Sequence, residues 1–217
     1  MTCLKLVALT GYCTGPRVVQ ALRYIEDANL YPIVFGNPAW KESKPVDLAG
    51  WRSAYEAVAE LIESDDNKLL RDLRECLIAS KEEQQIGWII TGLVPYSLIV
   101  YKDKYQPNKK DPKTLPALVS REGLKVDNKI RDTIDAAFSR VHEIIKLKDA
   151  LQSESLQSSS VSDGSHKKRQ APISREEVGI LFNDWGVSWK ASITAAMVSE
   201  LMVENGQSES IQALTLA

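Results

Sequence analysis

The chain has 217 residues, of which 44% are hydrophobic and 26% are charged, and its formal net charge is −2 at pH 7. This composition is that of an ordinary soluble globular protein, and a net charge this small does not by itself imply a polyanionic partner. The three cysteines include no close pair, which argues against a disulfide scaffold and favours a reducing compartment. We therefore expect an intracellular, cytoplasmic location, with the nucleus also open.

The N-terminal part predicts a strand, a helix and a second strand. Residues 4–10 are short and apolar, as in a buried strand. Pro16 suits the first turn of a helix over residues 16–27, where its missing N–H does no harm. Residues 31–35 are again short and apolar and are followed by Gly-Asn-Pro. This order is the beginning of a βαβ unit.

The middle of the chain predicts helices and one buried segment. Residues 48–62 and 68–79 repeat apolar side chains at helical spacing. Residues 86–101 contain no charge, but this run of sixteen is shorter than the roughly 20 residues of a bilayer-spanning helix, and Pro95 lies within it. We expect buried core here, either a hairpin or a broken helix, and no membrane contact.

The C-terminal third predicts a long helix, a tether and a helical hairpin. Residues 127–151 form the longest amphipathic pattern. Seven of the fourteen residues from 152 to 165 are serine, and only two are aliphatic, so this segment cannot bury enough apolar surface to order itself. Ser174 and Glu177 then form a capping box, and Gly186 separates two further helical patterns.

These elements predict an α+β fold dominated by helices. It has a small βαβ-like N-terminal start, a long amphipathic helix, a flexible serine-rich tether and a C-terminal αα-hairpin. The predicted domains are a mixed α+β body (1–151), a flexible serine-rich and basic linker (152–173), a helical hairpin (174–205) and a frayed tail (206–217).

Cys13 is a weak candidate for a catalytic nucleophile. It lies in a Gly-x-Cys-x-Gly turn between the first strand and the first helix, which is similar to a nucleophile elbow. The chain has two histidines, His142 in the long helix and His166 in the tether, and neither is an obvious base. A small buried thiol in a glycine-rich turn explains the pattern equally well. We assign no other catalytic residue. No metal and no cofactor are expected, because no ligand spacing and no complete nucleotide-binding motif is present.

A basic segment is the candidate nucleic-acid site. From residue 102 to residue 131 there are nine Lys/Arg against four Asp/Glu, with tyrosines interleaved. Lysines neutralise phosphates and tyrosines can stack on bases, so single-stranded RNA is the favoured partner. A solvated lysine-rich loop is the alternative. The residues are Tyr101, Lys102, Lys104, Tyr105, Lys109, Lys110, Lys113, Arg121, Lys125, Lys129 and Arg131.

The hairpin is the candidate protein-binding element. From residue 174 to the C-terminus there are six acidic residues against two basic ones, which disfavours a DNA-reading helix. Phe182, Trp185 and Trp189 are large apolar side chains of the kind that anchor interfaces with another protein or a neighbouring subunit.

Together these features favour a non-enzymatic intracellular binding protein. Its basic segment would contact nucleic acid, and its tethered hairpin would contact a protein or a second subunit. Two alternatives stay open: a small cysteine-dependent hydrolase or transferase that uses Cys13, and a purely structural, self-assembling subunit. Enzymatic activity is thus left undecided, with a non-enzymatic role favoured.

Overall fold

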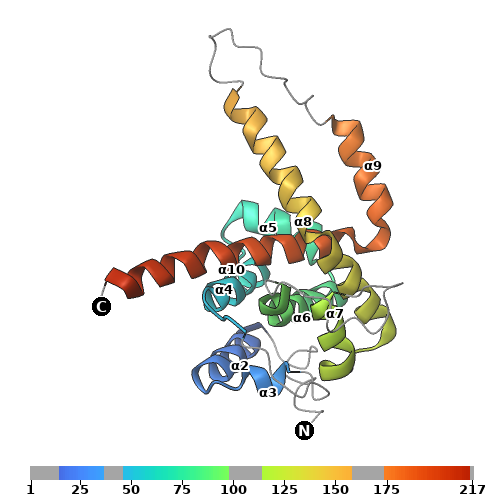
Figure 1. The fold of residues 1–217 in the computed structure, drawn as a ribbon. Coiled ribbons are helices and arrows are strands. Elements are labelled where there is room, and N and C mark those ends of the chain that lie inside the picture. Colours follow the sequence, from blue (N-terminus) through green and yellow to red (C-terminus); the bar gives the residue numbers. More distant parts are fainter. Residues whose placement is uncertain (1–14, 37–45, 98–113, 158–173, 216–217) are drawn as a thin grey trace.

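The computed structural model describes residues 15–36, 46–97, 114–157 and 174–215, and all structural statements below refer to these ranges. They form helices packed around a main hydrophobic core (Figure 1). In chain order the elements are α2 (Gly15–Asp27), α3 (Tyr31–Val34), α4 (Trp51–Glu63), α5 (Lys68–Leu77), α6 (Lys81–Ser97), α7 (Leu115–Val119), the π-helical turn η2 (Ser120–Leu124), α8 (Asn128–Gln157), α9 (Arg175–Trp185), the 3-10 turn η3 (Gly186–Ser188) and α10 (Trp189–Thr215).

The described ranges contain no strand, so the predicted α+β fold with a βαβ-like start is wrong, whereas the dominance of helices is confirmed. The predicted second strand is the single helical turn α3. Pro32 lies at the start of that turn, where its missing N–H breaks no hydrogen bond. Tyr31 and Phe35 are four residues apart and both fully buried, as expected for one face of a helix. The predicted first strand lies outside the described residues.

The described part of the uncharged segment, residues 86–97, forms the C-terminal part of α6, so of the two alternatives the buried helix is right and the hairpin is wrong. Pro95 lies inside the helix and cannot donate a hydrogen bond to the carbonyl of Thr91, four residues earlier. The indole Nε1 of Trp51 donates to that carbonyl instead, at 2.8 Å. A side chain of α4 therefore satisfies the acceptor that the proline leaves without a partner.

The helix α10 crosses α4, α6 and α8 and shares their hydrophobic core (Figure 1). Its buried side chains are mostly small, including Ala191, Ala195 and Ser199, which lets neighbouring helices approach closely. It continues to Thr215, past residue 205, where the predicted hairpin ended. The domain boundaries stay a prediction, because most of the proposed linker lies outside the described residues.

The predicted long helix is confirmed as α8, the longest helix in the described ranges, and it runs to Gln157. Its first half is buried through Ile130, Ile134 and Phe138. Beyond its crossing with α10, the second half extends away from α2 and α3, on the same side as α9 (Figure 1). The capping box of α9 is also confirmed, with Ser174 and Glu177 each bonded to the other's backbone N–H.

Candidate functional site

Four residues of the predicted nucleic-acid site lie in the described ranges, and they surround the connection between α7 and α8. We call Arg121, Lys125, Lys129 and Arg131 the basic edge. Arg121 lies in η2, Lys125 in the link that follows, and Lys129 and Arg131 in the first turn of α8. The other seven predicted residues, from Tyr101 to Lys113, lie outside the described ranges.

The local backbone of the basic edge is unusual. Residues 120–124 form a π-helical turn, and Lys125 ends it with a φ of 55°, in the left-handed region that non-glycine residues rarely adopt. The backbone N–H groups of Lys125 and Val126 both donate to the carbonyl of Ser120. The Ser120 side chain is fully buried, and its hydroxyl donates to the carbonyl of Ala117. The turn is thus fixed by internal hydrogen bonds while Arg121 and Lys125 stay exposed.

The four cations differ in their electrostatic surroundings. Lys129 Nζ lies 2.6 Å from Glu82 Oε1, and this hydrogen bond raises the pKa of Lys129 above its ordinary value. Arg131 is bonded to Asp132, at 2.8 Å, and to Asn128. Within the described ranges, the Arg121 and Lys125 side chains have no hydrogen bond or ion pair. Two of the four charges are therefore available to an external anion.

The predicted partner-binding aromatic residues are brought together at the elbow between α9 and α10. The Phe182 ring centroid lies 5.2 Å from that of Trp185 and 5.1 Å from that of Trp189. Trp185 is only 5% exposed, and its carbonyl accepts a hydrogen bond from Arg140 of α8. These contacts hold the elbow against α8. A role of the three side chains in binding a partner stays a prediction.

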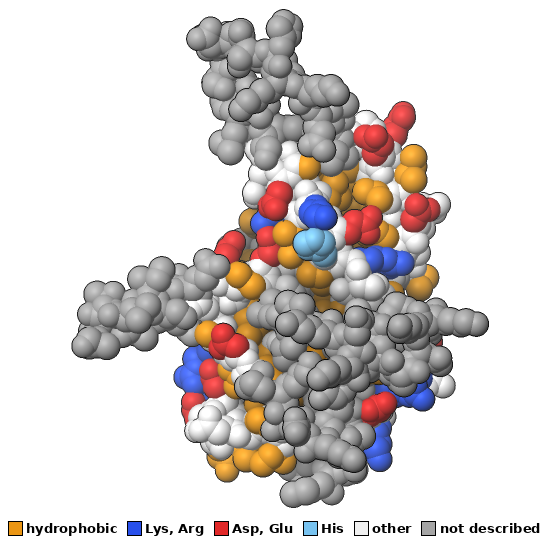
Figure 2. Space-filling view, viewed as in Figure 1, with side chains coloured by type: hydrophobic (Ala, Val, Ile, Leu, Met, Phe, Trp, Pro, Cys, Tyr) orange, Lys and Arg blue, Asp and Glu red, His pale blue; other side chains and the backbone are white. Residues whose placement is uncertain are grey.

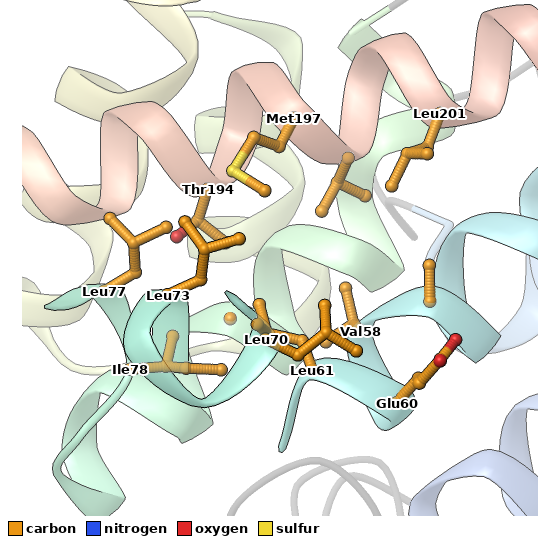
Figure 3. A pocket seen from close by; sticks show the side chains of 13 residues that line it. Val58, Glu60, Leu61, Leu70, Leu73, Leu77, Ile78, Thr194, Met197 and Leu201 are labelled. Carbon is orange, nitrogen blue, oxygen red and sulfur yellow. The ribbon is translucent and has the colours of Figure 1, made fainter. Parts of the chain in front are cut away.

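A groove that the sequence did not reveal lies between α10 and the pair α4 and α5 (Figure 3). We call it the α5–α10 groove; its volume is about 210 Å³. Leu70, Leu73 and Leu77 of α5 face Met197 and Leu201 of α10 across it. The leucine stripe of α5 was visible in the sequence, but its partner helix is more than a hundred residues away.

A second groove, with a volume of about 490 Å³, follows the crossing of α8 and α10. Figure 2 shows hydrophobic and acidic side chains beside one another near this crossing. Glu200 forms an ion pair with Lys148, and that hydrogen bond raises the pKa of Lys148. The buried Ser199 hydroxyl donates to the carbonyl of Ala195, 2.7 Å away. The lining residues are Ser97, Phe138, Val141, His142, Ile145, Ser199, Glu200, Val203 and Glu204.

In the part of the chain that the structure describes, no three His, Cys, Asp or Glu side chains are grouped so that they could hold a metal ion. None of the described helices combines the length and the hydropathy needed to cross a membrane. Cys13, the candidate nucleophile, lies outside the described residues. His142 lines the second groove, whereas the other histidine lies outside the described ranges.

Comparison with known proteins finds a similarity to an enzyme. Over 134 residues the chain is 28% identical to a protein of Purpureocillium lilacinum named nucleotidyltransferase lcsQ. The alignment covers 61% of this chain and 22% of that protein, so the chain matches about a fifth of its length. No family model and no solved structure matches the chain.

This similarity corrects the functional expectation drawn from the sequence. That relative is named as an enzyme, so the similarity contradicts the expectation of a non-enzymatic binding protein. The sequence could not indicate this class, because the complete phosphate-binding and dinucleotide-binding motifs that we sought are absent from it.

Proposed function

We propose that this chain is a helical domain of an enzyme that transfers nucleotidyl groups, and that its basic edge contacts the phosphates of the nucleotide or nucleic acid involved. The observation that carries the proposal is the 134-residue similarity to a nucleotidyltransferase. Because the chain matches only 22% of that protein, we assign it a supporting role within such an enzyme and name no catalytic residue.

The geometry of the basic edge supports a contact with phosphates. Arginine and lysine bind phosphate oxygens through charge-assisted hydrogen bonds, most strongly where no carboxylate competes. Arg121 and Lys125 meet this condition within the described ranges. The first half of α8 is anchored in the core, and Asp127 caps it by accepting a hydrogen bond from the N–H of Ile130 at 3.0 Å. The turn before α8 that carries Arg121 and Lys125 is fixed by the hydrogen bonds to the Ser120 carbonyl. The backbone that carries these cations is therefore held in place, which limits the entropy lost on binding.

The test measures binding by fluorescence anisotropy. The full chain is titrated into fluorescein-labelled single-stranded RNA, and separately into a fluorescent ATP analogue, at 50 and 200 mM KCl. We expect RNA binding that weakens with salt, as counterion release requires. The double variant Arg121→Glu/Lys125→Glu should lose roughly tenfold in RNA affinity, and the salt slope should fall by about 1.4, the value for two lost single-strand phosphate contacts.

Lys146→Glu is the matched control, because this exposed lysine lies on α8 but away from the basic edge. It makes the same charge change at one position and should alter RNA affinity by less than about twofold. Equal losses in the single variants Lys125→Glu and Lys146→Glu would show that net charge alone matters and would overturn the assignment of the site.

The enzymatic part of the proposal is tested with nucleoside triphosphates labelled at the α-phosphate. The chain is incubated with each triphosphate, Mg²⁺ and RNA, and the label that becomes attached to RNA is measured. Chain-dependent labelling supports a domain that takes part in transfer, and binding of nucleotide or RNA without labelling supports a domain that holds them. If the chain neither labels RNA nor binds either ligand at 50 mM KCl, the proposal fails.

A further inference from the structure

We propose that the α5–α10 groove binds a small amphiphile with an aliphatic tail and a positively charged end, such as an alkylammonium ion. The proposal rests on the size, the chemistry and the two different ends of the groove, and it is independent of the proposed function.

The size and the lining of the groove fit an apolar tail. Its volume is about 210 Å³, and leucine, isoleucine, valine and methionine side chains make most of its wall. An engineered apolar cavity of about 150 Å³ in another protein stays dry and binds benzene. The α5–α10 groove therefore offers more apolar space than a benzene ring needs. Burial of a tail there is favourable because it removes the apolar surface of the tail and that of the groove wall from water.

The groove is elongated, which favours a chain over a compact ring. Along α10 its wall runs from Thr194 to Leu201, about 10 Å at 1.5 Å per helical residue. With C–C bonds of about 1.5 Å, an extended aliphatic chain of roughly eight carbons covers this distance. The Thr194 hydroxyl donates to the carbonyl of Lys190 at 2.9 Å, so the polar atom in this wall already has a partner.

The two ends of the groove differ in charge. Leu77 and Ile78 lie at one end, whereas the Glu60 carboxylate lies at the end near Leu201 (Figure 3). Glu60 is exposed and has no hydrogen bond or ion pair with its side chain in the described ranges. An ammonium group beside Glu60, with its tail toward Leu77, would match both ends.

The same charges argue against a second copy of the chain as the occupant. The groove borders the segment from residue 56 to residue 83, which has nine acidic residues against four basic ones. Two copies docked through this face would bring like charges together, and this repulsion disfavours association.

The test compares three ligands by isothermal titration calorimetry of the full chain at pH 7, where aliphatic amines are protonated. The ligands are n-octylammonium, n-butylammonium and n-octanoate. Each buried methylene should add about fourfold in affinity, so n-octylammonium, with four more methylenes, should bind roughly 200-fold more tightly than n-butylammonium. It should bind about 1.5- to fivefold more tightly than n-octanoate, the range expected for one exposed charge pair.

Variants locate the site. Glu60→Gln should remove the preference for the ammonium over the carboxylate, whereas Glu63→Gln, on the same helix but outside the groove, should keep it. Met197→Trp fills the groove and should abolish binding of every ligand; Leu201→Trp is a second blocking variant in case the first fails to fold. The methyl NMR signal of Met197 should shift on titration of the parent chain.

Several results would overturn the proposal. These are equal affinity for the octyl and butyl ligands, equal affinity for n-octylammonium and n-octanoate, or unchanged binding by a folded blocking variant. Sedimentation velocity adds one more readout: if the parent chain self-associates and Met197→Trp dissociates it, the groove is occupied by a second copy and not by an amphiphile.

Discussion

Two hydrophobic regions of the molecule are packed very differently. One is the cluster of buried aromatic rings from α3, α4 and α6, which we call the aromatic core, and the other is the helix α5 with its leucines, which we call the α5 flank. In the aromatic core, Tyr31, Phe35, Trp51, Tyr55 and Tyr96 are at most 2% exposed, and neighbouring ring centroids lie 4.8 to 6.1 Å apart. On the α5 flank, by contrast, Leu77 is the one buried residue of its helix among the described side chains, and Leu69 is 66% exposed.

The polar atoms of the aromatic core explain part of this contrast. The Tyr31 hydroxyl donates to the carbonyl of Gly92, and the Trp51 indole donates to that of Thr91, each at 2.8 Å. Both bonds join α6 to another helix, so they fix the orientation of the two large rings in addition to their burial. The leucines of α5 have no such bonds, and they leave the groove open beside them. Hydrophobic content alone therefore does not decide how tightly a region packs.

Trp51→Ala should give the largest loss of stability, because it removes both a fully buried ring and the donor to Thr91. We expect the free energy of unfolding to fall by about 3–5 kcal/mol, measured by urea denaturation followed by circular dichroism. Leu69→Ala is the control from the α5 flank and should change it by less than about 0.5 kcal/mol. Similar losses in both variants would contradict the contrast between the two regions.

Gly92→Ala tests how little space the aromatic core leaves. A Cβ at this position would lie 2.6 Å from Cε1 of Phe35, whose ring is fully buried against Tyr31 and Trp51. We expect a loss of about 1–3 kcal/mol in the free energy of unfolding, since overpacking outweighs the better helix propensity of alanine. In α9, Gly179 has no atom within 4 Å of such a Cβ, so Gly179→Ala should stabilise the protein slightly. Two alanine variants of equal stability would show that Phe35 can move aside.

The buried tyrosines make the aromatic core sensitive to alkali. Burial raises the pKa of Tyr96 to about 12, and it raises the pKa of Tyr31 well above its ordinary value of 10.0. Below pH 10 both tyrosines are protonated in the folded and the unfolded chain, and their contribution to stability is complete. Between about pH 10 and 12 the unfolded chain releases protons that the folded chain keeps, so stability falls as the pH rises.

This fall is measured as the urea midpoint at several pH values, with tyrosinate absorbance at 295 nm as the second readout. Tyr96→Phe should make the decline between pH 10 and 12 shallower, because one of the perturbed groups is gone. Other alkaline groups titrate in both proteins and cancel in the comparison. Identical slopes for the parent and Tyr96→Phe would rule out this tyrosine as a source of the decline.

The sequence predicts the amphipathic helices well, because their pattern is local. The stripes of α2 and α4 repeat at helical spacing, and Ser174 with Glu177 marks the start of α9. The sequence misses α3, since five apolar residues fit a strand and a helical turn equally well. It leaves α6 undecided because Pro95 suggests a break, and the donor that compensates for the proline, Trp51, is 44 positions away in the chain.

For the candidate sites, the sequence predicts which residues are charged, but it does not predict the grooves. Arg121 and Lys125 stand out in a basic segment, although only the structure shows that Lys129 and Arg131 have acidic partners. The α5–α10 groove joins residues as distant as Leu61 and Met197, so no local pattern contains it. The proposal of a nucleotidyl-transferring enzyme rests on similarity to another protein and not on any motif.

Arg52→Ala should have the smallest effect, because it changes the rim of the aromatic core and leaves the rings in place. Arg52 of α4 pairs with Glu26 at 3.0 Å and with Asp27 at 2.5 Å, both in α2, and its side chain is 43% exposed. Exposed pairs of this kind contribute about 0.2–1 kcal/mol, so we expect a loss in that range by urea denaturation at 50 mM salt.

The salt dependence of this loss separates charge from packing. In 1 M NaCl the Debye length falls to about 3 Å, and the difference between the parent and Arg52→Ala should become too small to measure. Glu26 also accepts a hydrogen bond from the buried Tyr55, at 2.8 Å. A loss that persists in 1 M NaCl would mean that Arg52 also positions Glu26 as the hydrogen-bond acceptor of Tyr55. Arg52 would then stabilise the aromatic core itself and not only the ion pairs beside it.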